Sequence, residues 1–162
     1  MFLATDMPER RHQKIRSFLP DEPVIAILLA AVDFEWTIRR AVIAMGTNTN
    51  RVIRDTVLNR CSGAEEYKDA WKKEVKTYLG KGLPDVVTDW HFIKKEAFLL
   101  RHQVIHGLRG MPSSKKTAER VEAFLAGSVS IAEFAEEQGI ELFGKRLPVR
   151  RKPRTAQSAS PP

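Results

Sequence analysis

The stretch VIAILLAAVDFEWTIRRAVIAM, residues 24–45, is the most strongly patterned part of this 162-residue chain. Its apolar residues recur at steps of three and four, which is the spacing of one face of an α-helix. Asp21 and Pro23 precede it as a helix start, and Gly46 follows it as a helix end. The pattern therefore predicts a long helix whose buried face holds Ile27, Leu28, Ala31, Phe34, Ile38, Val42 and Met45.

Helical patterns continue on both sides of this stretch, and no segment alternates apolar and polar residues as a half-buried strand does. Ser62 and Ser130 each stand three residues before a glutamate, the spacing of a capping box at a helix start. We expect further helices at 51–60, 62–79, 85 or 88 to 106, 117–126 and 130–138. Short loops between such helices predict an all-α fold, an antiparallel helical bundle.

The charge of the chain divides it into three parts: a basic N-terminal arm (1–21), a helical domain (22–143) and a basic tail (144–162). The tail holds six basic residues and no acid, which leaves +1 of the net charge of +7 to the other residues. Its prolines predict disorder, and a basic tail binds polyanions through counterion release. The RNA-binding candidates there are Lys145, Arg146, Arg150, Arg151, Lys152 and Arg154, with a merely solubilising tail as the alternative.

Several classes of protein are excluded by composition. The longest apolar run, 24–32, is shorter than the ~20 residues that span a bilayer, and the N-terminus lacks the pattern of a signal peptide. A single cysteine, Cys61, can form neither an intramolecular disulfide nor a cysteine-based zinc site. We therefore expect a cytoplasmic protein with no membrane partner. His102 and His106 have metal-compatible spacing but no apparent third ligand, so we expect no metal and no cofactor.

The stretch FLLRHQVIHGLRG, residues 98–110, places Arg101, His102 and His106 on an otherwise apolar helix. A guanidinium buried without a partner is costly, so Arg101 points outward, pairs with an acid or lines a cleft. An imidazole beside a fixed cation suits phosphodiester chemistry. However, Arg101 and His106 lie ~140° apart on an ideal helix, whereas His102 and His106 share a face. The alternative is structural: Arg101 pairs with Glu35 and His106 caps the helix.

The segment LLRHQVIHG, residues 99–107, resembles the motif of HEPN domains, in which an arginine and a polar residue precede a histidine that glycine often follows. Arg101, His102 and His106 match these motif positions. The family often has an acidic residue in an early helix, which Glu35 resembles best and Asp33 second. The resemblance covers about residues 22–126. One departure is Leu108, where some HEPN toxins carry a tyrosine.

The resemblance implies a fold, an activity and a partner. HEPN domains are helical bundles, and many are metal-independent endoribonucleases whose two motifs face each other across a homodimer. By this resemblance, His106 would remove a proton from a ribose 2′-hydroxyl and Arg101 would stabilise the phosphate charge. His102 and Gln103 would orient the RNA or His106. Toxin–antitoxin pairs and phage defence are the implied settings, with an antitoxin or another protein as a possible partner.

Two alternatives to an RNA-cleaving enzyme remain. The first is a non-catalytic HEPN-like module that binds nucleotides, nucleic acid or protein. The second rests on SIAEFAEEQGIE, residues 130–141, which resembles the first helix and turn of a helix-turn-helix unit. A recognition helix should follow such a unit, but Gly144 and Pro148 interrupt the next stretch. A DNA-binding regulator is therefore the lesser alternative.

Overall fold

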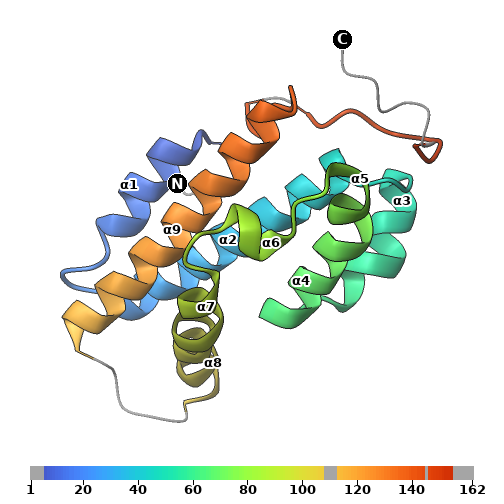
Figure 1. The fold of residues 1–162 in the computed structure, drawn as a ribbon. Helices are drawn as coiled ribbons and strands as arrows, with labels where there is room; N and C mark the ends of the chain where they lie inside the picture. Colours follow the sequence, from blue (N-terminus) through green and yellow to red (C-terminus); the bar gives the residue numbers. More distant parts are fainter. Residues whose placement is uncertain (1–5, 108–112, 145, 155–162) are drawn as a thin grey trace.

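Helix α2 (Pro23–Met45) is the centre of the fold in the computed structural model, which describes residues 6–107, 113–144 and 146–154. Helix α9 (Ser114–Glu137) lies along α2, and α1 (Pro8–Arg16) packs against both of them (Figure 1). The described residues form helices and no strand, which confirms the all-α fold. No helix among them is long and apolar enough to cross a bilayer.

Three further helical stretches pack around α2, and each contains a short turn of π-helix. The first is made of α3 (Asn50–Val52), η1 (Ile53–Val57) and η2 (Leu58–Arg60). The second is made of α4 (Ala64–Trp71), η3 (Lys72–Lys76) and α5 (Thr77–Leu79). After the short helix α6 (Leu83–Val86), the third is made of α7 (Trp90–Phe92), η4 (Ile93–Ala97) and α8 (Phe98–His106).

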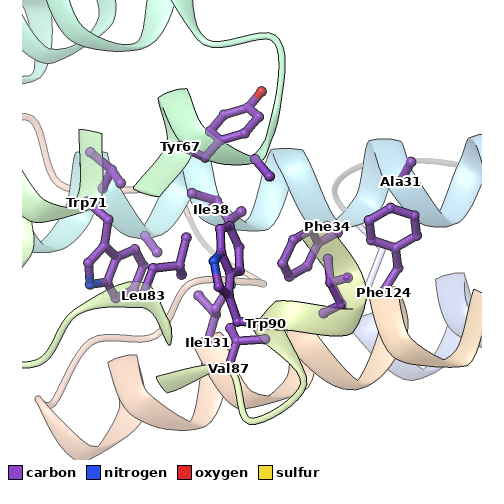
Figure 2. Close-up of a cluster of buried hydrophobic side chains, with 14 of the residues drawn as sticks. Ala31, Phe34, Ile38, Tyr67, Trp71, Leu83, Val87, Trp90, Phe124 and Ile131 are labelled. Carbon is purple, nitrogen blue, oxygen red and sulfur yellow. The ribbon is translucent and has the colours of Figure 1, made fainter. Parts of the chain in front are cut away.

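The core is a continuous cluster of apolar side chains between α2 and the helices around it (Figure 2). Phe34 is fully buried, and its ring centroid lies 5.5 Å from that of Phe124 on α9 and 6.2 Å from that of Phe98 on α8. Trp71 and Trp90 are also buried in this cluster. These contacts fix the start of α8 against α2, and the residues of the candidate motif follow directly on α8.

The sequence predicted a break between helices at 117–126 and 130–138, and this prediction is wrong because α9 is continuous from Ser114 to Glu137. Gly127 lies inside the helix, where it faces the side chains of Phe34 and Ile93. A Cβ atom at this position would lie 2.6 Å from Phe34 Cε2 and 3.1 Å from Ile93 Cδ1. The glycine therefore permits close packing of two helices rather than ending one of them.

Replacing Gly127 by alanine is expected to destabilise the protein by about 1–3 kcal/mol, because the added methyl group overpacks the core against Phe34. Helix propensity alone predicts the opposite sign, since alanine is favoured over glycine inside a helix by about 1 kcal/mol. Urea unfolding of the two proteins measures the difference. A stabilised Gly127→Ala variant would show that α9 and α2 do not approach as closely as described.

The helix ends predicted before Gly80, Gly107 and Gly139 are confirmed, whereas the predicted capping boxes are wrong. Gly80, Gly107 and Gly139 all have positive φ values, between 62° and 79°, as expected of residues that end helices. Gly63, not Ser62, precedes α4, and it makes no side-chain cap. Ser130 lies inside α9, and the side chain that caps this helix is that of Ser113, which accepts from Lys116 N.

The C-terminal segment 146–154 is not the disordered tail that the sequence predicted, because its side chains bind the end of α2. The Arg150 guanidinium donates to the carbonyls of Ile43, Ala44 and Asn48, and that of Arg154 donates to Ala44 O. The last carbonyls of a helix lack partners within the helix, and cations there are favourable. This segment therefore caps the C-terminal end of α2, although it is more than 100 residues away in the sequence (Figure 1).

The N-terminal arm is also part of the core. Ile15 of α1 is fully buried, and the side chains of Arg11 and His12 are buried beside Asp33 of α2. A bidentate pair of Arg16 and Glu122 joins α1 to α9 at the surface, with distances of 2.7 and 2.8 Å. The boundary that the sequence placed at residue 21 therefore does not separate α1 from the helical domain.

Candidate functional site

Arg101 and Glu35 form an ion pair between α8 and α2, with 3.3 Å between Arg101 Nη2 and Glu35 Oε1. Both side chains are partly buried, the arginine 26% exposed and the glutamate 15%. The contact lacks hydrogen-bond alignment, and Glu35 Oε1 accepts no hydrogen bond from the described residues. Arg101 is thus held by charge at the protein surface, which leaves its N–H groups available to an anion.

The other oxygen of Glu35 is held by Tyr67, a buried residue of α4 that donates to Oε2 over 3.2 Å. The Tyr67 hydroxyl accepts from Arg39 Nε over 2.9 Å, and Arg39 also donates to the carbonyls of Leu58 and Cys61. Figure 2 shows the Tyr67 ring at the edge of the core with its oxygen turned away from it. This chain of contacts fixes the position of Glu35 and, through it, that of Arg101.

Burial raises the pKa of both Tyr67 and Glu35. Burial, together with the nearby charge of Glu35, raises the pKa of Tyr67, so the hydroxyl stays protonated and remains a donor. Burial also raises the pKa of Glu35, against the opposing effect of Arg101, Tyr67 and Arg39. Tyr67 could not be assigned from spacing, because it lies 28 positions from Arg39 and 32 from Glu35.

Replacing Tyr67 by phenylalanine is expected to destabilise the protein by about 1–3 kcal/mol, because Glu35 loses a donor and Arg39 loses an acceptor in a partly buried site. The ring volume is unchanged, so no cavity contributes to the difference. Urea unfolding at pH 7 measures the effect. A variant as stable as the wild type would contradict the hydrogen bonds that place Tyr67 between Arg39 and Glu35.

His102 and His106 lie one turn apart on α8, with ring centroids separated by 4.3 Å, and both side chains are exposed. Gln103 is half-buried, and Gly107 ends the helix with a positive φ of 62°. No described contact joins Arg101 to His106, in agreement with the ~140° between them on an ideal helix. One copy of the chain therefore places the cation and the imidazole on different flanks of α8.

Asp33, the second candidate for the acidic residue, is not part of this site. Its carboxylate is buried with Arg11 Nε at 2.6 Å and His12 Nε2 at 3.0 Å. Residues 33 and 35 lie ~200° apart on a helix, so the two acids of α2 face opposite sides. The structure thus assigns Asp33 to the attachment of α1, and the expectation that it supports the site is wrong.

The tail candidates for RNA binding fall into three groups. Arg150 and Arg154 donate to carbonyls at the end of α2, so both have a structural role, and their binding of RNA stays a prediction. Arg146, Arg151 and Lys152 are exposed. Lys145 lies outside the described residues. The segments 140–144 and 146–154 form no helix after α9, so a second helix of a helix-turn-helix unit is absent from them.

Comparison with known proteins adds nothing to the fold and the geometry. No family model, curated protein or solved structure matches this chain. Among the described residues, no three His, Cys, Asp or Glu side chains gather as they would around a metal ion. The HEPN resemblance therefore stays a prediction, and a function has to be argued from the side chains of α2, α4 and α8.

Proposed function

We propose that this protein is a metal-independent endoribonuclease of HEPN type that acts as a homodimer. The observation on which the proposal depends is the contrast between Arg101, held at the surface by Glu35, and His106, exposed at the end of the same helix. A positioned guanidinium stabilises charge that develops on a phosphate, and an exposed imidazole can transfer protons. A toxin–antitoxin or phage-defence setting is part of the same proposal.

A second copy of the chain is needed because Arg101 and His106 lie on different flanks of α8. Two exposed apolar side chains flank the Arg101–Glu35 pair: Val32, three residues before Glu35, is 54% exposed, and Ile105, four residues after Arg101, is 49% exposed. Contiguous exposed apolar patches mark interaction surfaces, and we assign these two side chains to the surface that meets the second copy. A two-fold interface on this surface places two arginines and two histidines around one cleft.

The reaction follows from these groups. His106 of one copy accepts the proton of a ribose 2′-hydroxyl while the 2′-oxygen attacks the adjacent phosphorus. The bond from phosphorus to the 5′-oxygen breaks, and the second His106 or a water donates a proton to that leaving oxygen. Arg101 stabilises the charge on the non-bridging oxygens in the transition state. The products are a 2′,3′-cyclic phosphate and a 5′-hydroxyl.

The experiment is incubation of the purified full chain with a labelled single-stranded RNA in the presence of EDTA. The proposal predicts discrete RNA fragments, resolved on a denaturing gel, without added metal. The non-catalytic alternative predicts that the RNA shifts on a native gel and is recovered intact. Intact RNA at protein concentrations that saturate this shift would overturn the proposed activity.

A further inference from the structure

A groove of about 420 Å³ lies between the start of α4 and the helical stretch of η4 and α8. This volume falls in the range of small-ligand sites, about 300–1,000 Å³. Two residues of the candidate motif, Arg101 and His102, line one end of the groove. The other lining residues are Ser62, Gly63, Ala64, Glu65, Glu66, Lys94, Lys95, Phe98 and Leu99.

Some charged side chains of this groove form ion pairs within the part of the chain that the structure describes, and others do not. Lys94 and Lys68 both pair with Glu65, so that carboxylate is neutralised within the protein. Lys95 is exposed and forms no ion pair with any residue that the structure describes. Glu66, the other acid of the groove, lies on the opposite wall, on α4. The open cations of the groove are therefore on the side of η4 and α8.

One face of α8 leads from the groove to His106. Leu99, His102 and His106 follow each other at steps of three and four, so they share a face, and Lys95 lies about one turn before Leu99. All four side chains are exposed, including Leu99 at 50%. This row offers a cation for a phosphate and exposed surfaces for a ribose or a base, and proteins that bind single strands combine these two features in one groove.

We propose that this groove binds the nucleotide next to the cleaved phosphate of a single-stranded RNA. Lys95 and His102 contact its phosphate, and Leu99 packs against its ribose or base. Single strands are favoured because an unpaired nucleotide can turn its base into a protein groove, whereas the bases of a duplex stay stacked. The position next to the cleaved phosphate rests on the proposed function, whereas the binding of RNA in the groove can be tested separately.

The test measures binding of a fluorescent ten-nucleotide single-stranded RNA by fluorescence anisotropy. The protein is the full chain carrying His106→Ala, so that the RNA stays intact. Adding Lys95→Gln or Leu99→Ala is expected to weaken binding about fivefold each, and Lys95→Gln lowers the salt dependence by about one phosphate contact. The matched control is Lys73→Gln, which removes an exposed lysine from a different groove and should change Kd less than about twofold.

Each outcome decides one proposal. Equal effects of Lys95→Gln and Lys73→Gln, no binding of the RNA, or equally tight binding of duplex RNA overturns the groove assignment. If the wild type cleaves RNA while the Lys95 and Leu99 variants behave like the control, the groove assignment fails and the nuclease stands. If binding depends on Lys95 and Leu99 but the wild type leaves the RNA intact, the nuclease fails and the groove stands.

Discussion

Replacing His106 by alanine is expected to lower the rate of RNA cleavage by at least about 100-fold, because the variant lacks the proposed proton acceptor. The same change should alter the free energy of unfolding by less than about 0.5 kcal/mol, because the side chain is exposed at the end of α8. Loss of activity with an unchanged fold would therefore separate a chemical role for His106 from the structural role of a helix cap. Initial rates on a labelled RNA, with urea unfolding of the same samples, measure both quantities.

The matched control is His91→Ala. His91 is another exposed histidine of the same helical stretch, but it lies in α7, about four turns before His106. Its replacement should leave the rate of cleavage unchanged. Equal rates for His106→Ala and the wild type would contradict the proposed role. Equal losses in both variants would show that the measured activity depends on exposed histidines in general.

Replacing Asp33 by alanine is expected to destabilise the protein by about 3–5 kcal/mol, the cost of leaving one partner of a buried ion pair alone. Asp33 and Arg11 have side chains that are each 1% exposed, and 2.6 Å separates Asp33 Oδ1 from Arg11 Nε. Without the carboxylate, the Arg11 guanidinium remains buried against the rings of Trp36 and Phe143. Release of α1 from α2 is the expected result.

The control for Asp33 is Glu122→Ala, which removes the other ion pair that attaches α1. Arg16 and Glu122 are about half exposed, so their pair should contribute less than about 1 kcal/mol. Urea unfolding of both variants gives the comparison. If Asp33→Ala costs no more than Glu122→Ala, the buried pair does not hold α1, and the description of the arm as part of the core is wrong.

The ionisation of Asp33 should also make the stability of the protein depend on pH. Burial raises the pKa of this carboxyl, but the hydrogen bond with His12 and the charge of Arg11 outweigh burial and lower the pKa below its usual value. A lowered folded pKa stabilises the protein above the unfolded pKa of about 3.9, and this stabilisation is lost as pH falls through the folded value. Below pH 4, the stability of the wild type should therefore fall more steeply than that of Asp33→Asn.

The sequence was sufficient to predict a helix and its ends where the local residue pattern agrees with the burial in the structure. The apolar spacing of residues 24–45 predicted α2 almost to the residue, and the glycines after α5, α8 and α9 marked their ends. The sequence also offers the pairing of Arg101 with Glu35, as one way to satisfy a guanidinium on an apolar helix. These predictions depend on neighbours in sequence or on one strong energetic requirement.

Other features could not be predicted because they depend on distant contacts. Gly127 has the same local signal whether it breaks a helix or permits close packing, and only the position of Phe34 decides between them. The sequence predicts Arg150 as a cation of a disordered tail, whereas its guanidinium donates hydrogen bonds to the carbonyls of Ile43 and Ala44. Tyr67 of α4 donates a hydrogen bond to Glu35 of α2, and no residue spacing along the chain predicts this contact.

The most direct test of the central claim uses an RNA in which a single ribose, at a mapped cleavage site, is replaced by 2′-deoxyribose. Attack by the 2′-hydroxyl predicts that cleavage stops at that position and continues at unmodified sites. Each cut should leave a 2′,3′-cyclic phosphate on the upstream fragment and a 5′-hydroxyl on the downstream fragment. Continued cleavage at the deoxy position, or products with a 5′-phosphate, would contradict the mechanism built on Arg101 and His106.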